Sequence, residues 1–281
     1  MNRVCKVRQA RRVNMRGEHE RNDADATREA GASARGVVWE VLSLPERCVP
    51  SDHARQSTAY AMAKAFFHER ARDGEALVIV DLGCGDGNSV DFFRREVPGC
   101  QWIGVDIEGS PEVRSRRRDD AEFRTFDGVH IPLAGGEADL VFCNQAITHA
   151  DRPVELLADV RRILKPGGEL IGSMSYMEPI VTCSRTNFTP YGFHCELESA
   201  GLELHELRPG IDSITLILRR LLWKPWIFDR FYETESPLNR AIDWAGRWRK
   251  RSAREVNARK LLFAGQYVFR AGVKVSIEPA E

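Results

Sequence analysis

From residue 77 onward the chain alternates short apolar runs with amphipathic or charged stretches, and this rhythm constrains the fold more than any other feature. The apolar runs are bounded by Gly, Asp or Pro and lie at 77–83, 102–107, 123–127, 139–144 and 169–175. Runs that are apolar on both faces are typical of parallel strands covered on both sides. Of the stretches between them, 153–165 has apolar residues at helical spacing. The alternation predicts a doubly wound, mostly parallel α/β sheet with helices on both faces.

The remaining segments complete this plan. A helix is predicted at 189–201, and two more strands at 202–208 and 265–275 bring the sheet to seven strands. Residues 212–262 interrupt the rhythm and are predicted to be helical, with Pro225 as a break. Ahead of the sheet, a helix is predicted at 51–74, with Ser51 or Asp52 as its cap and Gly74 as its stop.

Four segments follow from this organisation. Residues 1–36 have almost no large apolar side chains, so we expect a disordered basic leader, with order beginning near Val37. Residues 37–211 are expected to form the ligand-binding core, and 212–262 a helical cap or lid inserted before the last strand. Residues 263–281 supply that strand and a C-terminal tail. With 281 residues the chain can bury a large core without disulfide or metal staples.

The formal net charge is zero, because 41 Lys and Arg balance 41 Asp and Glu. This neutrality is a cancellation, since the net charge is +4 for residues 1–36, −11 for 37–218 and +7 for 219–261. An acidic core suits a cationic ligand, and the basic segments can meet an anionic partner. The N-terminus lacks the apolar centre of a secretory signal. No run approaches the roughly 20 apolar residues of a membrane-spanning helix.

Seven cysteines are scattered along the chain and form no CxxC pair. This spacing argues against zinc ribbons and disulfide frameworks and favours reduced thiols in a cytoplasmic protein. We expect no metal site.

The first apolar run ends in a glycine-rich turn, VDLGCGDGN at residues 80–88. Glycines let a backbone turn tightly and approach a ligand that a Cβ atom would push away. Counted from Gly83, the dinucleotide fingerprint G-x-G-x-x-G requires a glycine where this chain has Asn88. Asp81 stands two residues before the first glycine, which disfavours a pyrophosphate and suits a positively charged ligand.

Two more acidic residues end the next two apolar runs. Asp106 lies about 20 residues past the glycine turn, where a carboxylate can accept hydrogen bonds from a ribose diol. Asp127 and Gly128 end the third run, where a side chain and a backbone amide can read an adenine edge. Ligands of such sheets bind beyond the carboxyl ends of the strands. Three acids at successive strand ends therefore predict a nucleoside-binding site.

These motifs resemble the class I S-adenosylmethionine-dependent methyltransferases, especially their small-molecule, methyltransferase type 11-like branch. The resemblance covers about residues 76–208 and includes VDLGCGDGNS, GVDI and the segment from FRTFDGVHIPL to RRILKPGG. It implies a Rossmann-like fold with S-adenosylmethionine as cofactor. Asp81 and the glycine turn would then flank the methionine part, Asp106 the ribose, Asp127 and Gly128 the adenine, and Asn144 the sulfonium. The cofactor-binding residues that it implies are Asp81, Gly83, Cys84, Gly85, Gly87, Asp106, Ile107, Asp127, Gly128 and Asn144.

One segment departs from the family pattern. His130-Ile131-Pro132 stands where the family more often has Leu-Pro-Phe, so adenine packing is expected to be looser.

The acceptor side has three candidate catalytic residues, His149, Tyr191 and His194. The sulfonium already activates the methyl group, so the protein must align the acceptor, exclude water and in some cases remove a proton. His149 follows the fourth apolar run and is either a base or a hydrogen-bonded loop anchor. Tyr191 lies in TPYGF, with Thr189 as an N-cap, and is either catalytic or a packing residue. TPYGF resembles enzymes of sugar, polysaccharide and secondary-metabolite pathways, which implies O-methylation of a small molecule.

The segment 212–262 allows several interpretations. One is a helical cap that buries an apolar face on the sheet, made of Leu216, Leu218, Leu221, Leu222, Trp223, Trp226, Ile227, Phe228 and Phe231. Others are a lid over an apolar acceptor pocket, a dimer surface, or a peripheral membrane contact through basic residues beside aromatics. No RNA-binding pattern accompanies it, so a nucleic-acid partner is not expected.

Three hypotheses for function remain open. The first is a methyltransferase acting on an oxygen of a small molecule, as a monomer or homodimer. The second is a catalytically silent partner subunit that binds S-adenosylmethionine. The third is an N- or C-methyltransferase acting on an apolar or membrane-associated substrate.

Overall fold

A computed structural model describes residues 42–70, 76–179, 183–223 and 225–274. The predictions for the leader 1–36, for the onset of order near Val37 and for the helix stop at Gly74 lie outside these ranges. Within them, no helix combines the length and the apolar character that crossing a bilayer would require.

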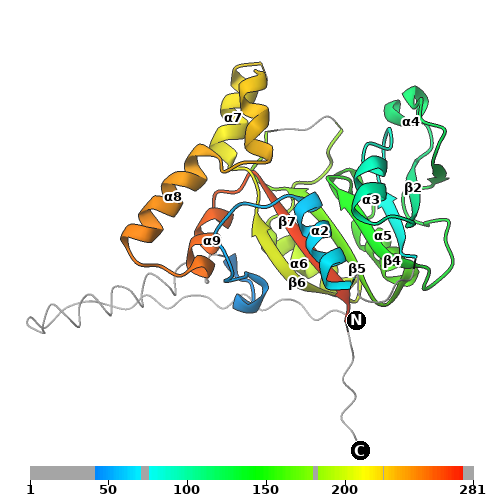
Figure 1. Ribbon diagram of the computed structural model, residues 1–281, viewed down its shortest axis with the longest axis horizontal. Helices are drawn as coiled ribbons and strands as arrows, with labels where there is room; N and C mark the ends of the chain where they lie inside the picture. Colours follow the sequence, from blue (N-terminus) through cyan, green and yellow to red (C-terminus); the bar gives the residue numbers. More distant parts are fainter. Residues whose placement is uncertain (1–41, 71–75, 180–182, 224, 275–281) are drawn as a thin grey trace, which may run out of the picture. The chain divides into compact units, whose positions relative to one another are not determined.

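The core is a seven-stranded sheet with the strand order β3-β2-β1-β4-β5-β7-β6 (Figure 1). Strands β1 to β5 pair in parallel, and β7 pairs antiparallel with both β5 and β6. The strand bounds are β1 Val78–Leu82, β2 Gln101–Ile107, β3 Glu122–Phe126, β4 Ala138–Asn144, β5 Leu164–Ser175, β6 Leu202–Pro209 and β7 Gln266–Val273. The predicted doubly wound, mostly parallel sheet is confirmed.

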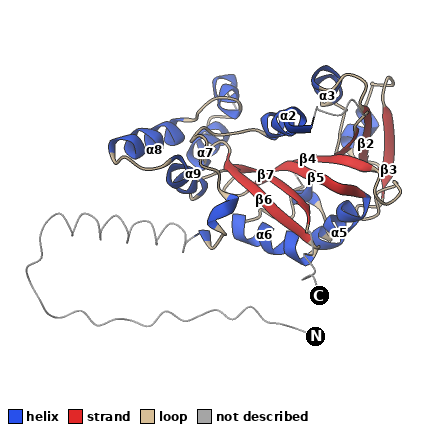
Figure 2. Ribbon diagram, turned by 60° about the horizontal axis from the view of Figure 1, so that its bottom comes forward, coloured by secondary structure: helices blue, strands red, loops and turns tan. Residues whose placement is uncertain are grey.

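Helices cover both faces of this sheet (Figure 2). One face carries α2 (Ala59–Arg70) and α3 (Val90–Glu96), and the other carries α5 (Pro153–Ile163) and α6 (Pro190–Ser199). Consecutive strand residues serve opposite faces: Ile79 packs in the cluster under α2 and α3, whereas Val80 packs in the larger cluster with α5 and α6. Both residues are fully buried, which explains why the strands read as uninterrupted apolar runs. Short elements complete this region: η1 (Glu46–Cys48), α4 (Pro111–Ser115) and η2 (Ile147–His149).

The helix predicted at 51–74 is wrong at its start. Helix α2 begins at Ala59, where the Thr58 hydroxyl accepts the Ala61 amide at 3.1 Å. Residues 49–57, which we call the strap, are not helical. The Asp52 carboxylate, expected to cap the helix, instead pairs with Arg208 of β6 at 2.9 Å. Long-range polar contacts thus outweigh the local helical pattern.

The segment between β6 and β7 is helical, as predicted. It contains α7 (Ser213–Leu221), η3 (Trp226–Tyr232), α8 (Pro237–Trp248) and α9 (Ala253–Leu261), with Pro225 at the N-cap of η3. The expected cap face is wrong for most of its residues. Leu216 and Phe231 are buried, but the rest of the α7 and η3 set is exposed or only partly covered. The reason is that the buried side of α7 is largely polar, with Asp212, Ser213 and Thr215 inside.

Candidate cofactor and acceptor site

The predicted binding residues meet at the carboxyl edge of the parallel strands. Asp81 pairs with Gly104 in the β1–β2 register, and Asp106 with Thr125 in the β2–β3 register. Asn144 ends β4. Because β1 to β4 run in parallel, the end of each strand and the loop after it lie along one edge.

The glycine turn after β1 requires glycine at two positions. Gly83 has a φ of +77°, and a Cβ atom there would lie 2.3 Å from the Cβ atom of Ala146. Gly87 has a φ of +78°, and its Cβ atom would lie 2.8 Å from the Phe123 ring. Glycine is thus required at both positions by the positive φ angle and by close packing against Ala146 and Phe123.

Asp106 joins the end of β2 to this turn. The Gly85 amide donates to Asp106 Oδ2 at 2.7 Å, and the Ile107 amide donates to Oδ1 at 2.7 Å. Each carboxylate oxygen has two acceptor positions, so each keeps one for a further donor. Ile107 is exposed beside it, so an apolar side chain and a carboxylate face the same region.

Asp81 lies beneath the turn and is only 5% exposed. The Ser89 hydroxyl donates to its carboxylate, and the Trp102 indole N–H donates to Ser89 Oγ at 3.0 Å. Burial raises the pKa of Asp81 to about 7, against the lowering effect of the Ser89 hydrogen bond. No sequence pattern pointed to Ser89 and Trp102, because they approach Asp81 only through the tertiary fold.

Asp127 is occupied by its own turn. Its Oδ1 accepts the amides of Val129 and His130 at 2.8 and 2.7 Å, and its Oδ2 lies 2.8 Å from His130 Nδ1. The hydrogen bond with His130 lowers the pKa of Asp127 and raises that of His130. The Gly128 amide follows at a φ of +92°. His130, noted as a departure from the family pattern, thus pairs with the acid that the resemblance assigns to adenine.

The ends of β4 and β5 carry a chain of polar side chains that sequence reasoning missed. Gln145, at a φ of +64°, donates through Nε2 to Ser173 Oγ at 2.9 Å, and that hydroxyl donates to Asn144. A sequence signal for these side chains existed, because Ser173 and Ser175 stand at alternate positions of the otherwise apolar run 170–175.

The chain of polar groups continues to Glu178. The Ser175 hydroxyl lies 2.6 Å from Gln145 Oε1 and 2.7 Å from Glu178 Oε2. Gln266 of β7 donates to the same Glu178 oxygen at 2.8 Å. A carboxylate is therefore fixed in the loop after β5, on the same edge as Asn144.

His149 lies half-buried in η2, next to this polar chain in sequence. The loop after β5 covers η2, because the amides of Arg185 and Thr186 donate to the Thr148 carbonyl at 2.8 and 3.2 Å. Backbone groups, not the His149 imidazole, make these anchoring contacts. We find no hydrogen bond of that imidazole to any residue that the structure describes.

Tyr191 lies in the first turn of α6 and is partly exposed. Thr189 caps this helix by accepting the Gly192 amide at 2.9 Å, as predicted. The Phe188 amide donates to the Ser175 carbonyl at 3.1 Å, which holds the start of α6 at the end of β5.

A groove of about 590 Å³ opens between the loop after β5 and α7. It is lined by Met177, Glu178, Pro179, Ile217, Arg220 and Leu221. Most of these side chains are apolar, and Glu178 also belongs to the polar chain. A second cavity, of about 550 Å³, lies near the start of β5 around Leu164 and Gly168. It is distant from the candidate site along the strand.

Residues 80–172 match the model of the family described as "Methyltransferase domain". The matched segment runs from the glycine turn through β5 and includes all the predicted cofactor-binding residues. Over this segment, which is less than half of the chain, the sequence is similar to S-adenosylmethionine-dependent methyltransferases.

Curated relatives match part of the chain. A malonyl-[acyl-carrier protein] O-methyltransferase of Hahella chejuensis is 31% identical over 106 residues, 37% of this chain and 38% of the relative. A demethylmenaquinone methyltransferase of Renibacterium salmoninarum is 28% identical over 114 residues, 40% of this chain and 47% of the relative. An uncharacterized 37.1 kDa protein in transposon TN4556 of Streptomyces fradiae is 31% identical over 153 residues, 51% and 44% of the two chains. The chain spans less than half the length of these relatives.

The residues at the carboxyl edge of the sheet fit S-adenosylmethionine, the cofactor of the methyltransferases that this segment resembles. The tight turn at Gly83 and Gly87 leaves no room for a side chain at either position, so the backbone of the turn lies directly at the strand edge. Asp106 keeps acceptor capacity that suits a ribose diol. Asp127 fits less well, because its carboxylate is already engaged by its own turn.

Proposed function

We propose that this chain transfers the methyl group of S-adenosylmethionine to a hydroxyl oxygen of a small acceptor that has an apolar portion. One observation carries the proposal: the apolar groove shares Glu178 with the polar chain that begins at Asn144. The polar group of an acceptor would thus lie beside the polar chain, and the apolar portion of the same molecule would lie in the adjacent groove. The similarity to a malonyl-[acyl-carrier protein] O-methyltransferase supports oxygen as the acceptor atom.

We assign the cofactor to the carboxyl edge. Asp106 would accept hydrogen bonds from the ribose hydroxyls, while Ile107 would pack against the adenine and the Gly128 amide would donate to it. Asp81, Gly83, Cys84, Gly85 and Gly87 would surround the methionine part, and Asn144 would lie near the sulfonium. When bound, the cofactor supplies a methyl carbon that its sulfonium makes electrophilic. Alignment and water exclusion then lower the barrier without covalent participation of the protein.

On the acceptor side, Glu178 and His149 take different roles. The Glu178 carboxylate lines the groove and is held by Gln266 at 2.8 Å, so it can accept a hydrogen bond from an acceptor hydroxyl and orient it. His149 is the group that would take the proton as the O–CH₃ bond forms, since its imidazole is not committed to the anchoring of its loop. Tyr191 is an alternative proton acceptor.

The proposal includes a cytoplasmic setting and either a monomer or a homodimer. The six cysteines in the described ranges are all free thiols, and free thiols persist in a reducing compartment. Of these, Cys48, Cys84 and Cys143 are buried.

The test is to incubate the full chain with methyl-labelled S-adenosylmethionine and a panel of acceptors. The panel pairs alcohols and phenols that have apolar bodies with matched amines and carbon nucleophiles. Transfer to the hydroxyl compounds supports the proposal, and transfer only to amines or carbon overturns the oxygen assignment. Calorimetric binding of the cofactor with no transfer to any acceptor would favour the silent partner subunit instead.

A further inference from the structure

Helix α7 presents its apolar stripe to solvent. Ile214, Ile217, Leu218, Leu221 and Leu222 follow the i, i+3, i+4, i+7, i+8 spacing that places side chains on one helix face. All five are exposed, and Leu221 reaches 69%. In a globular protein such a stripe normally faces the core. In α7 the apolar stripe instead faces solvent, and the opposite, largely polar side is buried.

Polar contacts on the opposite side fix this orientation. The Asp212 carboxylate accepts the Thr215 amide at 2.7 Å, the Thr215 hydroxyl at 2.9 Å and the Leu238 amide at 3.3 Å. The Ser213 amide donates to the Phe263 carbonyl at 2.9 Å. Asp212, Ser213 and Thr215 are all buried. Rotating α7 to bury the stripe would break these hydrogen bonds. The hydrogen bonds of the folded chain therefore keep the stripe exposed.

Tryptophans extend the exposed surface beyond α7. Trp223, just after the helix, is 94% exposed, and Trp226 at the start of η3 is 81% exposed. Helix α8, which contacts α7, adds the exposed side chains of Trp244 and Trp248 one turn apart. Tryptophan is enriched where a protein meets the membrane–water interface, because its ring is apolar and its N–H is polar.

The charge of the same segment is basic. Residues 213–250 contain eight Lys and Arg but four Asp and Glu. Three of these four acidic side chains form ion pairs within the protein: Asp229 pairs with Arg219, and Glu235 and Asp243 pair with the buried Lys260. The exposed surplus is therefore cationic, with Arg230, Arg240, Arg249 and Lys250 among its members.

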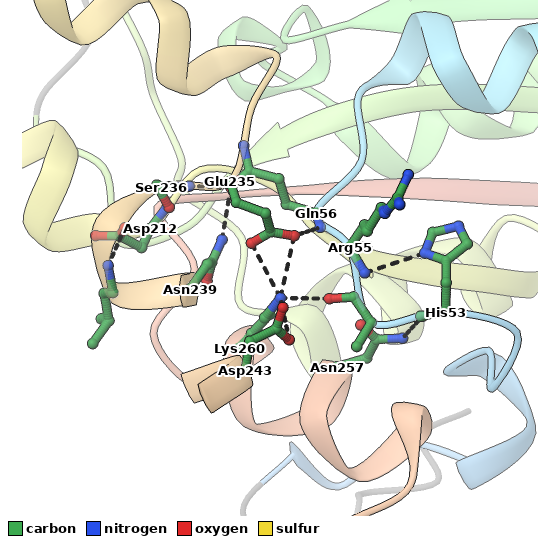
Figure 3. Close-up of polar contacts among 12 residues, drawn as sticks. His53, Arg55, Gln56, Asp212, Glu235, Ser236, Asn239, Asp243, Asn257 and Lys260 are labelled. Atoms are coloured by element: carbon green, nitrogen blue, oxygen red, sulfur yellow. Dashed lines mark hydrogen bonds and ion pairs between the residues drawn. The ribbon is translucent and has the colours of Figure 1, made fainter. Parts of the chain in front are cut away.

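A polar network holds this surface on the rest of the molecule (Figure 3). The Gln56 side chain of the strap donates to the Phe231 carbonyl at 2.7 Å and accepts the Ser236 amide at 3.0 Å and Asn239 Nδ2 at 2.9 Å. Lys260 donates to the Ala54 carbonyl of the strap. The exposed face is thus presented by a fixed support.

We propose that α7, Trp223, η3 and α8 through Lys250 form a docking face for an anionic lipid surface, with the apolar stripe and tryptophans entering the headgroup region and the exposed basic side chains meeting lipid phosphates. An amphipathic helix with a basic polar side binds membrane interfaces in this way. Anionic lipids of the cytoplasmic leaflet attract such basic segments. Aliphatic Ile and Leu contribute little to nucleic-acid binding, which relies on phosphate contacts and base stacking, so lipid is the favoured partner.

The docking face also bears on the acceptor. Ile217 and Leu221 belong both to the exposed stripe and to the groove beside Glu178. An acceptor dissolved in the bilayer could therefore reach the groove without crossing water. This step rests on the proposed function, whereas the docking face does not.

Co-sedimentation of the full chain with vesicles tests the docking face without any methyl transfer. We expect binding to vesicles of equal parts phosphatidylcholine and phosphatidylglycerol, and at least tenfold weaker binding to phosphatidylcholine alone. The double variant Trp223→Ser/Trp226→Ser should lose at least tenfold in vesicle affinity while keeping the wild-type melting temperature, because both rings are exposed.

The charge arm uses a matched pair of triple variants. Arg240→Gln/Arg249→Gln/Lys250→Gln should weaken binding to the anionic vesicles several-fold. Arg47→Gln/Arg94→Gln/Arg95→Gln removes the same number of exposed charges outside the docking face and should leave binding unchanged. Equal losses in both variants would show non-specific attraction and overturn the proposal.

If the docking face binds a partner other than lipid, the same experiments would give different results. A dimer in light scattering that the Trp223→Ser/Trp226→Ser variant dissociates, without vesicle binding, would assign the face to a second copy and overturn the proposal. Binding to single-stranded RNA but not to vesicles, or vesicle binding only after removal of residues 1–41, would overturn it as well. Vesicle binding without methyl transfer would sustain the docking face and leave the proposed function to fail on its own test.

Discussion

The Lys260 ammonium group lies 3.0 Å from the Asp243 carboxylate, with none of the lysine side chain exposed. It is also 3.1 Å from Glu235, so one buried cation joins α9, α8 and the residues after η3 (Figure 3). Removing one partner of a buried ion pair is costly, because the remaining charges lose their compensation. We therefore expect Lys260 to contribute strongly to the stability of the helical segment between β6 and β7.

Substituting Lys260→Met should lower the free energy of unfolding by about 3–5 kcal/mol. Urea denaturation of the full chain measures this change. Lys274→Met removes an exposed lysine and is the matched control, for which we expect almost no change. A loss below about 1 kcal/mol for Lys260→Met, the range of exposed ion pairs, would contradict the structural role.

Substituting Asp106→Ala should weaken S-adenosylmethionine binding by about 1–3 kcal/mol, the cost of losing a charged hydrogen-bonding group. Isothermal titration calorimetry measures the affinity directly. Asp119→Ala, at an exposed aspartate, is the control and should bind like the wild type. Unchanged affinity in Asp106→Ala would rule out the assigned ribose contact.

His149→Ala should leave cofactor affinity close to that of the wild type, because the imidazole is assigned to the acceptor proton. Turnover should fall by about 10²–10⁴-fold, the usual contribution of general base catalysis. Steady-state kcat for the best acceptor of the panel provides the measurement. If kcat is retained, His149 is not the base, and Tyr191→Phe becomes the variant to assay.

Glu178→Gln should raise KM for the acceptor by about tenfold, because an amide is a weaker acceptor of a hydroxyl hydrogen bond than a carboxylate. We expect the affinity for the cofactor to stay the same. Glu233→Gln changes an exposed carboxylate outside the groove and provides the comparison. A fall in cofactor affinity with no change in acceptor KM would instead assign Glu178 to the cofactor.

Asp81 should make stability depend on pH. Burial raises its folded-state pKa from 3.8 to about 7, so its proton is held more tightly in the folded chain than in the unfolded chain. The stabilisation is present below the unfolded pKa and is lost as the pH rises to about 7. Between those limits the folded chain should lose up to about 4 kcal/mol relative to an Asp81→Asn variant.

Urea denaturation of both proteins at about pH 5 and about pH 8 tests this sign, because the difference between them cancels the other titrating groups. If the wild type gains stability over Asp81→Asn as the pH rises, Asp81 is not held protonated by its burial.

The strands were predictable because each apolar run is covered on both faces, as Ile79 and Val80 illustrate. The positions of Asp81, Asp106 and Asn144 followed, since parallel strands place their ends on one edge. The partners of these side chains were not predictable. Ser89 reaches Asp81 only because α3 folds back beside β1, and His130 takes up the Asp127 carboxylate through a turn whose conformation the sequence does not specify.

Two errors share one physical cause. The helix start was predicted from Ser51 or Asp52 as a cap, but Asp52 and Gln56 instead contact Arg208 and Ser236. The apolar side chains of α7 and η3 were predicted to be buried as a cap face, but apolar character alone does not say which way a helix face points. Here buried hydrogen bonds of Asp212 set that direction. Long-range polar contacts, which leave no periodic trace, decided both cases.

The side-chain amide of Gln56 bonds on both of its ends to the helical segment between β6 and β7. Residues near the start of the described chain thus clasp a segment made much later during synthesis. Movement of that segment away from the sheet would break these hydrogen bonds of Gln56 and expose the Lys260 ammonium group. Under the proposed function, an acceptor would therefore enter and leave through the open side of the groove.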